Sequence, residues 1–149
     1  MIEADDVRGV PPNAIGIHAL VWVGDTGPAS VDLAVEKTVA SGYGLLEFSL
    51  HDSLNLDRAK TREVLVSNGI KAACSRGLAR DADISSDDPQ VVKRGAALLQ
   101  ESLQLTHDIG GTVLTGALYS AFGKASQPLS AAGRANVVSV LQGDRKSVV

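Results

Sequence analysis

Segments rich in β-favouring residues alternate along this chain with segments of helical periodicity. The runs 15–22, 45–50, 70–75 and 112–119 are predicted to be strands, and a helix is predicted after each of them. Consecutive strands that are separated by a helix need a crossover connection, and such connections give parallel sheets covered by helices. The alternation therefore predicts an α/β fold of about four βα units.

Each predicted helix starts at a favoured N-cap and stops near a glycine or a polar tail. Asp88 and Pro89 give the clearest start, because an aspartate accepts from the orphan amides and a proline fits the first helical position. The same reasoning gives all the expected limits, which are Ser30 to Ser41-Gly42, Asp57 to Asn68-Gly69, Asp88 to Gly110-Gly111, and Ser130 through Leu141.

Composition excludes several classes of protein. With 149 residues, 44% hydrophobic content and a net charge of -3, the chain has the composition of a globular domain. No apolar stretch reaches the roughly 18 residues that a transmembrane helix needs, and the acidic N-terminus is unlike a secretory signal. The single Cys74 cannot close an intrachain disulfide, which fits a reducing compartment. We therefore expect a cytoplasmic protein without a membrane partner.

The charge pattern also bears on partners. Lysines and arginines are scattered, with no basic run before the tail, so the sequence gives no electrostatic footprint for nucleic acid. A small or neutral ligand is the expected partner.

Side chains alternate between the two faces of a strand, which assigns the polar positions to one face. In the second strand Leu46, Phe48 and Leu50 share the face that suits a cover of helices. In the first strand the residues expected under helices are Ile15, Ile17, Ala19 and Val21, with Gly16 and Leu20 on the other side. The opposite face then collects His18, Trp22, Glu47, Ser49 and His51. In a closed parallel barrel that face is the interior, and groups near the strand C-terminal ends line the ligand-binding mouth.

The segments LLEFSLHDSLNLDRAKTREVLVSNGIKAACSRGL and GGTVLTGALYSAFGK resemble the N-terminal half of the sugar phosphate isomerase/epimerase superfamily, the xylose-isomerase-like TIM barrels. The branch that resembles the chain most is that of the ketose 3-epimerases acting on tagatose and allulose. The resemblance covers about Ile15 to Leu141. It implies an incomplete (βα)8 barrel over residues 15–141, preceded by a flexible segment 1–14.

The resemblance also implies a chemistry. Members of this family abstract a proton next to a carbonyl with a pair of glutamates around Mn²⁺, Mg²⁺ or Co²⁺, which is held by two Glu, an Asp and a His on the fifth to eighth strands. This chain has no glutamate after Glu101 and, beyond Asp108, only Asp144. We therefore expect a metal for the parent enzyme, commonly a homodimer or homotetramer, but no metal binding and no catalysis by this fragment.

The tail 142–149 departs from the family pattern. Asp144 to Val149 matches what a common sequencing adapter encodes in one reading frame, so we expect a non-native tail on a truncated chain; a natural polar tail is the alternative. If the barrel is half-built, its open edges should make the fragment self-associate or aggregate.

The residues that the resemblance assigns to the sugar pocket each have a structural alternative. The set is His18, Trp22, Glu47, Ser75, Gly116 and Ala117. Glu47 is either a sugar contact or a structural ion pair, His18 a ligand or a hydrogen-bonded core histidine, and Trp22 a pocket wall or a packing residue. His51 and His107 are expected on the surface, and Cys74 as a buried inert thiol.

Four other functions remain as alternatives, of which the last is disfavoured. An inosose dehydratase or a hydroxypyruvate isomerase would share the fold and the metal. A self-standing flavodoxin-like binding module would use the loop Gly24-Asp25-Thr26-Gly27 to hold a phosphate at a helix N-terminus. The DNA-repair nuclease branch of the superfamily is disfavoured, because its histidine ligands are replaced by Cys74-Ser75-Arg76 and Leu118-Tyr119-Ser120.

Overall fold

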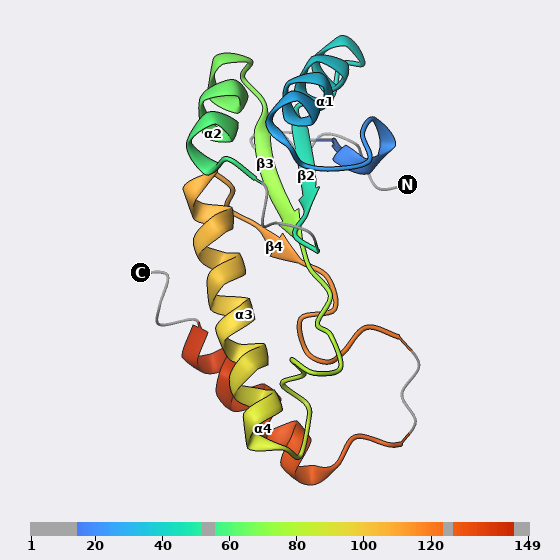
Figure 1. Ribbon diagram of the computed structural model, residues 1–149, viewed down its shortest axis with the longest axis vertical. Helices are drawn as coiled ribbons and strands as arrows, with labels where there is room; N and C mark the ends of the chain where they lie inside the picture. Colours follow the sequence, from blue (N-terminus) through green and yellow to red (C-terminus); the bar gives the residue numbers. More distant parts are fainter. Residues whose placement is uncertain (1–14, 52–55, 124–126, 145–149) are drawn as a thin grey trace, which may run out of the picture.

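The computed structural model describes residues 15–51, 56–123 and 127–144. The expected flexible segment 1–14 and residues 145–149 of the expected tail lie outside these ranges. Strands and helices alternate as predicted (Figure 1). The elements are β1 Gly16–His18, the 3-10 helix η1 Ala19–Val21, α1 Pro28–Ala40, β2 Leu45–Ser49, α2 Arg58–Ser67, β3 Lys71–Ser75, α3 Pro89–Asp108, β4 Leu114–Thr115 and α4 Ala131–Asp144.

The four strands form one parallel sheet in the order β1-β2-β3-β4. Each strand lies beside its successor in the sequence, so every crossover steps in the same direction, as it does around a barrel. A flavodoxin-like sheet would have the order 2-1-3-4-5, with helices on both faces. The observed order confirms the part-barrel prediction and shows that the flavodoxin-like alternative is wrong.

The main core lies between one face of the sheet and the helices. Members from β2, β3, α1 and α3 are Leu46, Phe48, Cys74, Val35 and Leu105. The alternation predicted for β2 is confirmed, because Leu46 and Phe48 are buried whereas Glu47 and Ser49 are only partly covered. Each fully buried side chain of this size contributes about 1.5–3 kcal/mol, so this face holds the sheet and its helices together.

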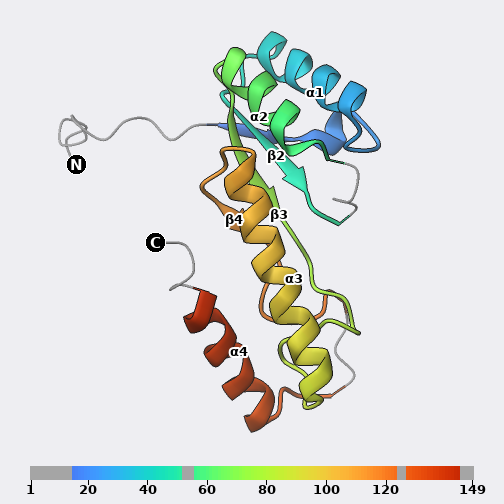
Figure 2. The ribbon, with the colours of Figure 1, turned by 60° about the vertical axis from the view of Figure 1, so that its left-hand side comes forward.

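A second, smaller core attaches α4 to α3. Leu78, Ile84 and Leu99 are buried in it, and Val137 and Val140 of α4 pack against them. The two helices run beside each other at the end of the molecule away from α1 (Figure 2). The segment that follows β3, which contains Leu78, is therefore the part of the chain against which α4 is anchored.

The first strand is shorter than the predicted range 15–22. It ends at His18, because the imidazole Nδ1 accepts a hydrogen bond from the Leu20 amide at 3.1 Å and caps the 3-10 turn that follows. The predicted alternation consequently fails beyond this point. Val21, expected under the helices, is 60% exposed, and Trp22 packs instead against the main core. The prediction is also wrong for Ile15, before the strand, which was expected under the helices and is 73% exposed.

The fourth strand is also shorter than predicted, with two residues instead of the range 112–119. Gly116 follows at once with a φ of 114°, which turns the chain out of the extended conformation. Single hydrogen bonds continue the contact with the segment after β3, including one from the Leu78 amide to the Ala117 carbonyl at 3.3 Å. The two chain segments that leave β3 and β4 therefore stay together beyond the sheet.

The helix limits largely follow the predicted caps. Asp57 accepts from the Lys60 amide at 3.0 Å and Asp88 from the Gln90 amide at 2.8 Å, which confirms both N-caps. The start of α1 differs from the prediction: Gly27 is its N-cap and Pro28 occupies the first turn, before Ser30. The last helix continues past Leu141 to Asp144. No helix within the described ranges has the length and hydropathy needed to cross a membrane.

Candidate functional site

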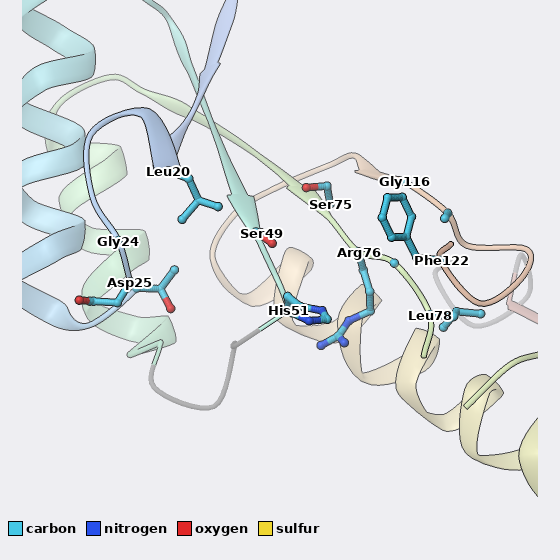
Figure 3. Close-up of a pocket in the computed structure, with 13 residues that line it drawn as sticks. Leu20, Gly24, Asp25, Ser49, His51, Ser75, Arg76, Leu78, Gly116 and Phe122 are labelled. Carbon is cyan, nitrogen blue, oxygen red and sulfur yellow. The ribbon is translucent and has the colours of Figure 1, made fainter. Parts of the chain in front are cut away.

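A pocket of about 490 Å³ opens at the carboxyl ends of the parallel strands. The segments that follow all four strands contribute to its wall, as Figure 3 shows. Its lining residues are Leu20, Gly24, Asp25, Thr26, Ser49, His51, Ser75, Arg76, Gly77, Leu78, Gly116, Ala117 and Phe122. Parallel α/β sheets commonly bind ligands at this edge, because loops of several strands converge there.

Two serines form the polar floor of the pocket. Ser49 ends β2 and Ser75 ends β3, and the two are paired residues in the parallel register. The Leu50 amide donates to the Ser75 carbonyl at 2.8 Å, which fixes the two strand ends against each other. Hydroxyls that are held on adjacent rigid strands can bind vicinal polar groups of a small ligand.

Asp25 contributes a carboxylate from the loop after β1. Its Oδ1 accepts from the Gly27 amide at 2.8 Å, and hydrogen bonds from Ser30 and Gly27 hold the pKa of this carboxyl below its usual value. The Gly27 amide at the start of α1, which a phosphate would need as a donor, therefore already donates to this carboxylate. This geometry is unsuitable for the phosphate-binding loop considered for residues 24–27.

His18 and Glu47 lie side by side in the sheet. They are register partners on β1 and β2, and Nε2 of His18 is 3.9 Å from Oε1 of Glu47. Because Nδ1 accepts from the Leu20 amide, the proton of a neutral ring is carried by Nε2, which faces the carboxylate. Neither residue lines the pocket, but Ser49 follows Glu47 on the same strand face and does line it.

Backbone geometry shapes the wall formed by β4. A Cβ at Gly116 would overlap the carbonyl oxygen of Arg76. The positive φ of this glycine also disfavours any residue with a side chain. Phe122 stands over Gly77, where an added Cβ would lie 3.1 Å from the Phe122 Cβ. The glycines thereby allow two chain segments to approach closely and leave the Phe122 ring, 79% exposed, at the rim.

Arg76 is the cation of the pocket wall. Its partial burial lowers the pKa of the guanidinium, and the negative charge of Glu101 opposes this effect. Cys74 alternates with the pocket residue Ser75 along β3 and is buried in the core. Burial there raises the pKa of the Cys74 thiol, and a hydrogen bond with Thr106 partly offsets the rise. Cys74 is therefore part of the core and not of the pocket, as predicted.

The six residues that the family resemblance assigned to a sugar site fall into three groups. Ser75, Gly116 and Ala117 line the pocket. His18 and Glu47 adjoin it on the sheet. Trp22 does not share their face: its ring packs against the main core, and its Nε1 is buried without a partner within the described part of the chain.

Sequence reasoning assigned no ligand role to several lining residues. His51 was expected on the surface and is exposed, yet it lies at the pocket mouth. Arg76 directly follows β3 and could have been found from that position alone, because strand C-terminal ends carry ligand contacts. Phe122 is on a connecting loop, for which strand periodicity gives no signal. Asp25 was considered only as part of the phosphate-binding loop of the flavodoxin-like alternative.

The described residues do not offer the donor set of a metal site. Within residues 15–51, 56–123 and 127–144, no three His, Cys, Asp or Glu side chains lie close enough together to hold a metal ion. Glu47 and His18 form a pair only. A divalent metal held by two Glu, an Asp and a His therefore does not fit this part of the chain.

No family profile matches the chain, but individual proteins do. A ketose 3-epimerase of Arthrobacter globiformis is 38% identical over 122 residues, which are 82% of this chain and 42% of that protein. An L-ribulose 3-epimerase of Methylomonas sp. strain DH-1 is 36% identical over 127 residues, 85% of this chain and 44% of that protein.

Solved structures show the same partial match. The structure of a D-allulose 3-epimerase from Methylomonas sp. in complex with D-allulose superposes with a TM-score of 0.84 at 34% identity, over 89% of this chain and 46% of that one. A structure of L-ribulose 3-epimerase superposes with a TM-score of 0.85 at 28% identity, over 90% of this chain and 45% of that one. The chain thus spans about half the length of the relatives that it matches.

Proposed function

Because this chain belongs to the ketose 3-epimerase family within the sugar phosphate isomerases and epimerases, we propose that it is the part of such an enzyme that receives the ketose. The pocket at the strand ends is its sugar site. The observation that carries the proposal is the coincidence of two facts: the chain superposes on a D-allulose complex over 89% of its length, and its pocket lies at the strand ends, where parallel barrels bind substrates.

The residues of the pocket suit a ketose. A ketose is a neutral polyol, so it needs hydrogen-bonding groups for its hydroxyls and apolar surface for its C–H faces. Ser49 and Ser75 supply hydroxyls and Asp25 an acceptor, while Leu20 and Phe122 supply apolar walls. We assign Ser75, Gly116 and Ala117 to direct contact with the sugar, and His18 with Glu47 to the adjoining inner wall. Trp22 receives no role in this proposal.

We further propose that epimerisation needs residues beyond those described. Proton abstraction next to a carbonyl requires a base beside the carbon and a Lewis acid on its oxygens, and the described residues do not assemble a metal-binding group. The complete enzyme would take the metal on its other barrel half and assemble as a homodimer or homotetramer in the cytoplasm. The 149-residue chain alone is expected to bind sugar without turning it over.

Sugar binding is tested by recording amide spectra of the isotopically labelled chain during titration with D-allulose, D-tagatose and L-ribulose. Saturable shifts at Ser49, Ser75 and Gly116 are expected, in the millimolar range of a half-built site. Sorbitol, a polyol without a carbonyl, is the ligand control. The variant Ser75→Ala should weaken binding, whereas Ser67→Ala, at an exposed site at the end of α2, should leave it unchanged. Absence of shifts with every ketose would contradict the proposal.

A second measurement separates binding from catalysis. The chain should show no epimerisation of these ketoses, with or without added Mn²⁺, when the products are separated by chromatography. Measurable turnover by the purified chain would show that it contains the catalytic groups after all, and would overturn the half-enzyme part of the proposal while leaving the sugar site intact.

A further inference from the structure

The imidazole of His18 orients the backbone of a pocket residue. Its Nδ1 accepts a hydrogen bond from the Leu20 amide at 3.1 Å, which makes His18 the N-cap of η1. The first amides of a helix have no partner inside the helix, so a side-chain acceptor fixes the direction in which they point. Leu20 lines the pocket, and its amide is the one that His18 holds.

The short helix η1 is anchored in the core at its two ends and not at Leu20. Ala19 is buried in the main core, and Trp22 packs against the same core. Leu20 is 54% exposed, and in Figure 3 its side chain lies between Ser49 and Asp25. It thus forms an apolar wall between two polar groups of the pocket. Because the core does not hold Leu20, the position of this wall depends on the hydrogen bond to its amide.

The cap requires a neutral ring. In a neutral imidazole one nitrogen carries a proton and the other accepts, whereas in an imidazolium both nitrogens are donors. A proton on Nδ1 of His18 would face the N–H of Leu20, and two donors repel each other. Protonation of His18 therefore breaks the cap. Histidine is the side chain that ordinarily changes its charge between pH 5 and 8, so the cap can be tested in that range.

The charged groups near the ring do not replace this hydrogen bond. Glu47 of β2 is the acid that faces His18, with its Oε1 3.9 Å from Nε2. That contact involves the other nitrogen, which carries a proton in the neutral ring and in the charged ring alike. The titratable side chains that line the pocket are Asp25, His51 and Arg76, from the segments after β1, β2 and β3. Protonation of His18 thus retains its contact with Glu47 and loses the one with Leu20.

We propose that His18 is a positioning residue of the sugar site, and that its protonation weakens ketose binding by releasing Leu20 from the pocket wall. The inference rests on the proposed function, because it concerns the same pocket. It gives His18 a role through the backbone of Leu20 and not through a contact with the sugar. D-allulose should bind about fivefold more weakly at pH 5 than at pH 7.5, which corresponds to the loss of one N-cap.

Two substitutions separate the roles of the two ring nitrogens. In asparagine Oδ1 is bonded to Cγ, as Nδ1 is in histidine, so His18→Asn retains an acceptor for the Leu20 amide that does not titrate. In glutamine the polar group lies one bond farther out, so His18→Gln can face Glu47 but is a poor cap. His18→Asn should bind D-allulose as the unmodified chain does at pH 7.5, and equally well at pH 5. His18→Gln should bind it about fivefold more weakly at both pH values.

The dissociation constants are measured from amide spectra recorded during titration with D-allulose at the two pH values. His51→Asn is the control for a pH dependence that arises at the pocket mouth, and it should keep the loss of affinity at pH 5. The proposal is overturned if the unmodified chain binds equally at both pH values, or if His18→Asn still loses affinity in acid. It is also overturned if His51→Asn abolishes the loss, or if His18→Gln binds better than His18→Asn, because the active nitrogen would then be Nε2.

A measurement without sugar distinguishes failure of this inference from failure of the proposed function. During a pH titration of the free chain, the Leu20 amide signal should move with the same midpoint as the ring signals of His18. In His18→Asn it should not move. If ketoses bind but the Leu20 signal does not follow the ring, this inference alone fails. If the signal follows the ring but no ketose binds at either pH, the proposed function fails, and the ligand part of this inference fails with it.

Discussion

Nε2 of His18 lies 3.9 Å from Oε1 of Glu47, while Nδ1 of the same ring accepts the Leu20 amide at 3.1 Å. One imidazole thus faces a carboxylate on β2 and also ends β1 by capping the turn that follows. The strand end and the pocket loop after it depend on the same side chain. This relationship gives the first prediction.

His18→Ala should lower the free energy of unfolding by about 1 kcal/mol, because it removes the acceptor that caps η1. His18→Asn should retain most of the stability, since an asparagine oxygen is a favoured N-cap acceptor. Urea denaturation followed by circular dichroism measures both. If the alanine variant is as stable as the parent, the ring does not act as a cap.

Gly116→Ala should destabilise the chain by about 2 kcal/mol or more, since a positive φ alone costs an alanine about 1–2 kcal/mol and its Cβ would also overlap Arg76. The matched control is Gly24→Ala, which also lies on the pocket wall but has no atom within 4 Å of the added Cβ. That variant should stay within about 0.5 kcal/mol of the parent. Thermal denaturation of the two variants gives the comparison.

Acid should abolish the contribution of the Asp108 carboxylate to the free energy of unfolding. A hydrogen bond from Arg58, at 2.8 Å, and another from Gln104 hold the pKa of this carboxyl below its ordinary value of 3.8. A carboxyl whose pKa is lowered in the folded state stabilises the fold at pH values above its ordinary pKa. This stabilisation is lost as the pH falls through the folded-state pKa. Because the pair is partly exposed, its contribution stays within about 1 kcal/mol.

Arg58→Gln should therefore lower the urea midpoint at pH 7, and the difference from the parent should vanish near pH 2. Arg62→Gln is the control, because the guanidinium of Arg62 donates to the backbone carbonyls of His107 and Asp108. A backbone carbonyl does not change its charge between these pH values. The effect of Arg62→Gln on the midpoint should be the same at both pH values. A difference for Arg58→Gln that persists in acid would show that the ion pair is not the cause.

The thiol of Cys74 should be unreactive in the folded chain. It is buried in the core between β3 and α3, and burial raises its pKa, so little thiolate is present at neutral pH. The aromatic disulfide reagent DTNB should react with it only at the rate of unfolding, and at once in urea. Rapid reaction in native buffer would mean that the core between the sheet and the helices opens readily.

Much of the fold could be predicted from short-range patterns. The alternation of Leu46 and Phe48 with Glu47 and Ser49 identified the buried face of β2, and the aspartates at 57 and 88 identified two helix starts. These features depend on residues close together in the sequence, for which the rules of periodicity and capping hold. The order of the strands followed from the resemblance and the repeated crossovers.

The parts that were wrong depend on contacts between distant residues or on unusual caps. A histidine ring as the N-cap of η1 is not visible in the apolar run 15–22, so the strand was extended too far and Trp22 was placed on the wrong face. The close approach of Gly116 to Arg76, which ends β4, also joins segments forty residues apart. For the same reason the pocket residues on loops, such as Phe122, were missed.

Leu78 belongs to two regions at once. It lines the pocket and is buried in the smaller core against which Val137 and Val140 of α4 pack. A substitution that enlarges the pocket at this position would also loosen the last helix, and a change in the packing of that helix would displace the pocket wall. Attempts to alter ligand size by mutation should therefore target rim positions such as Leu20, where shape can be varied without a penalty in the anchoring of the terminal helix.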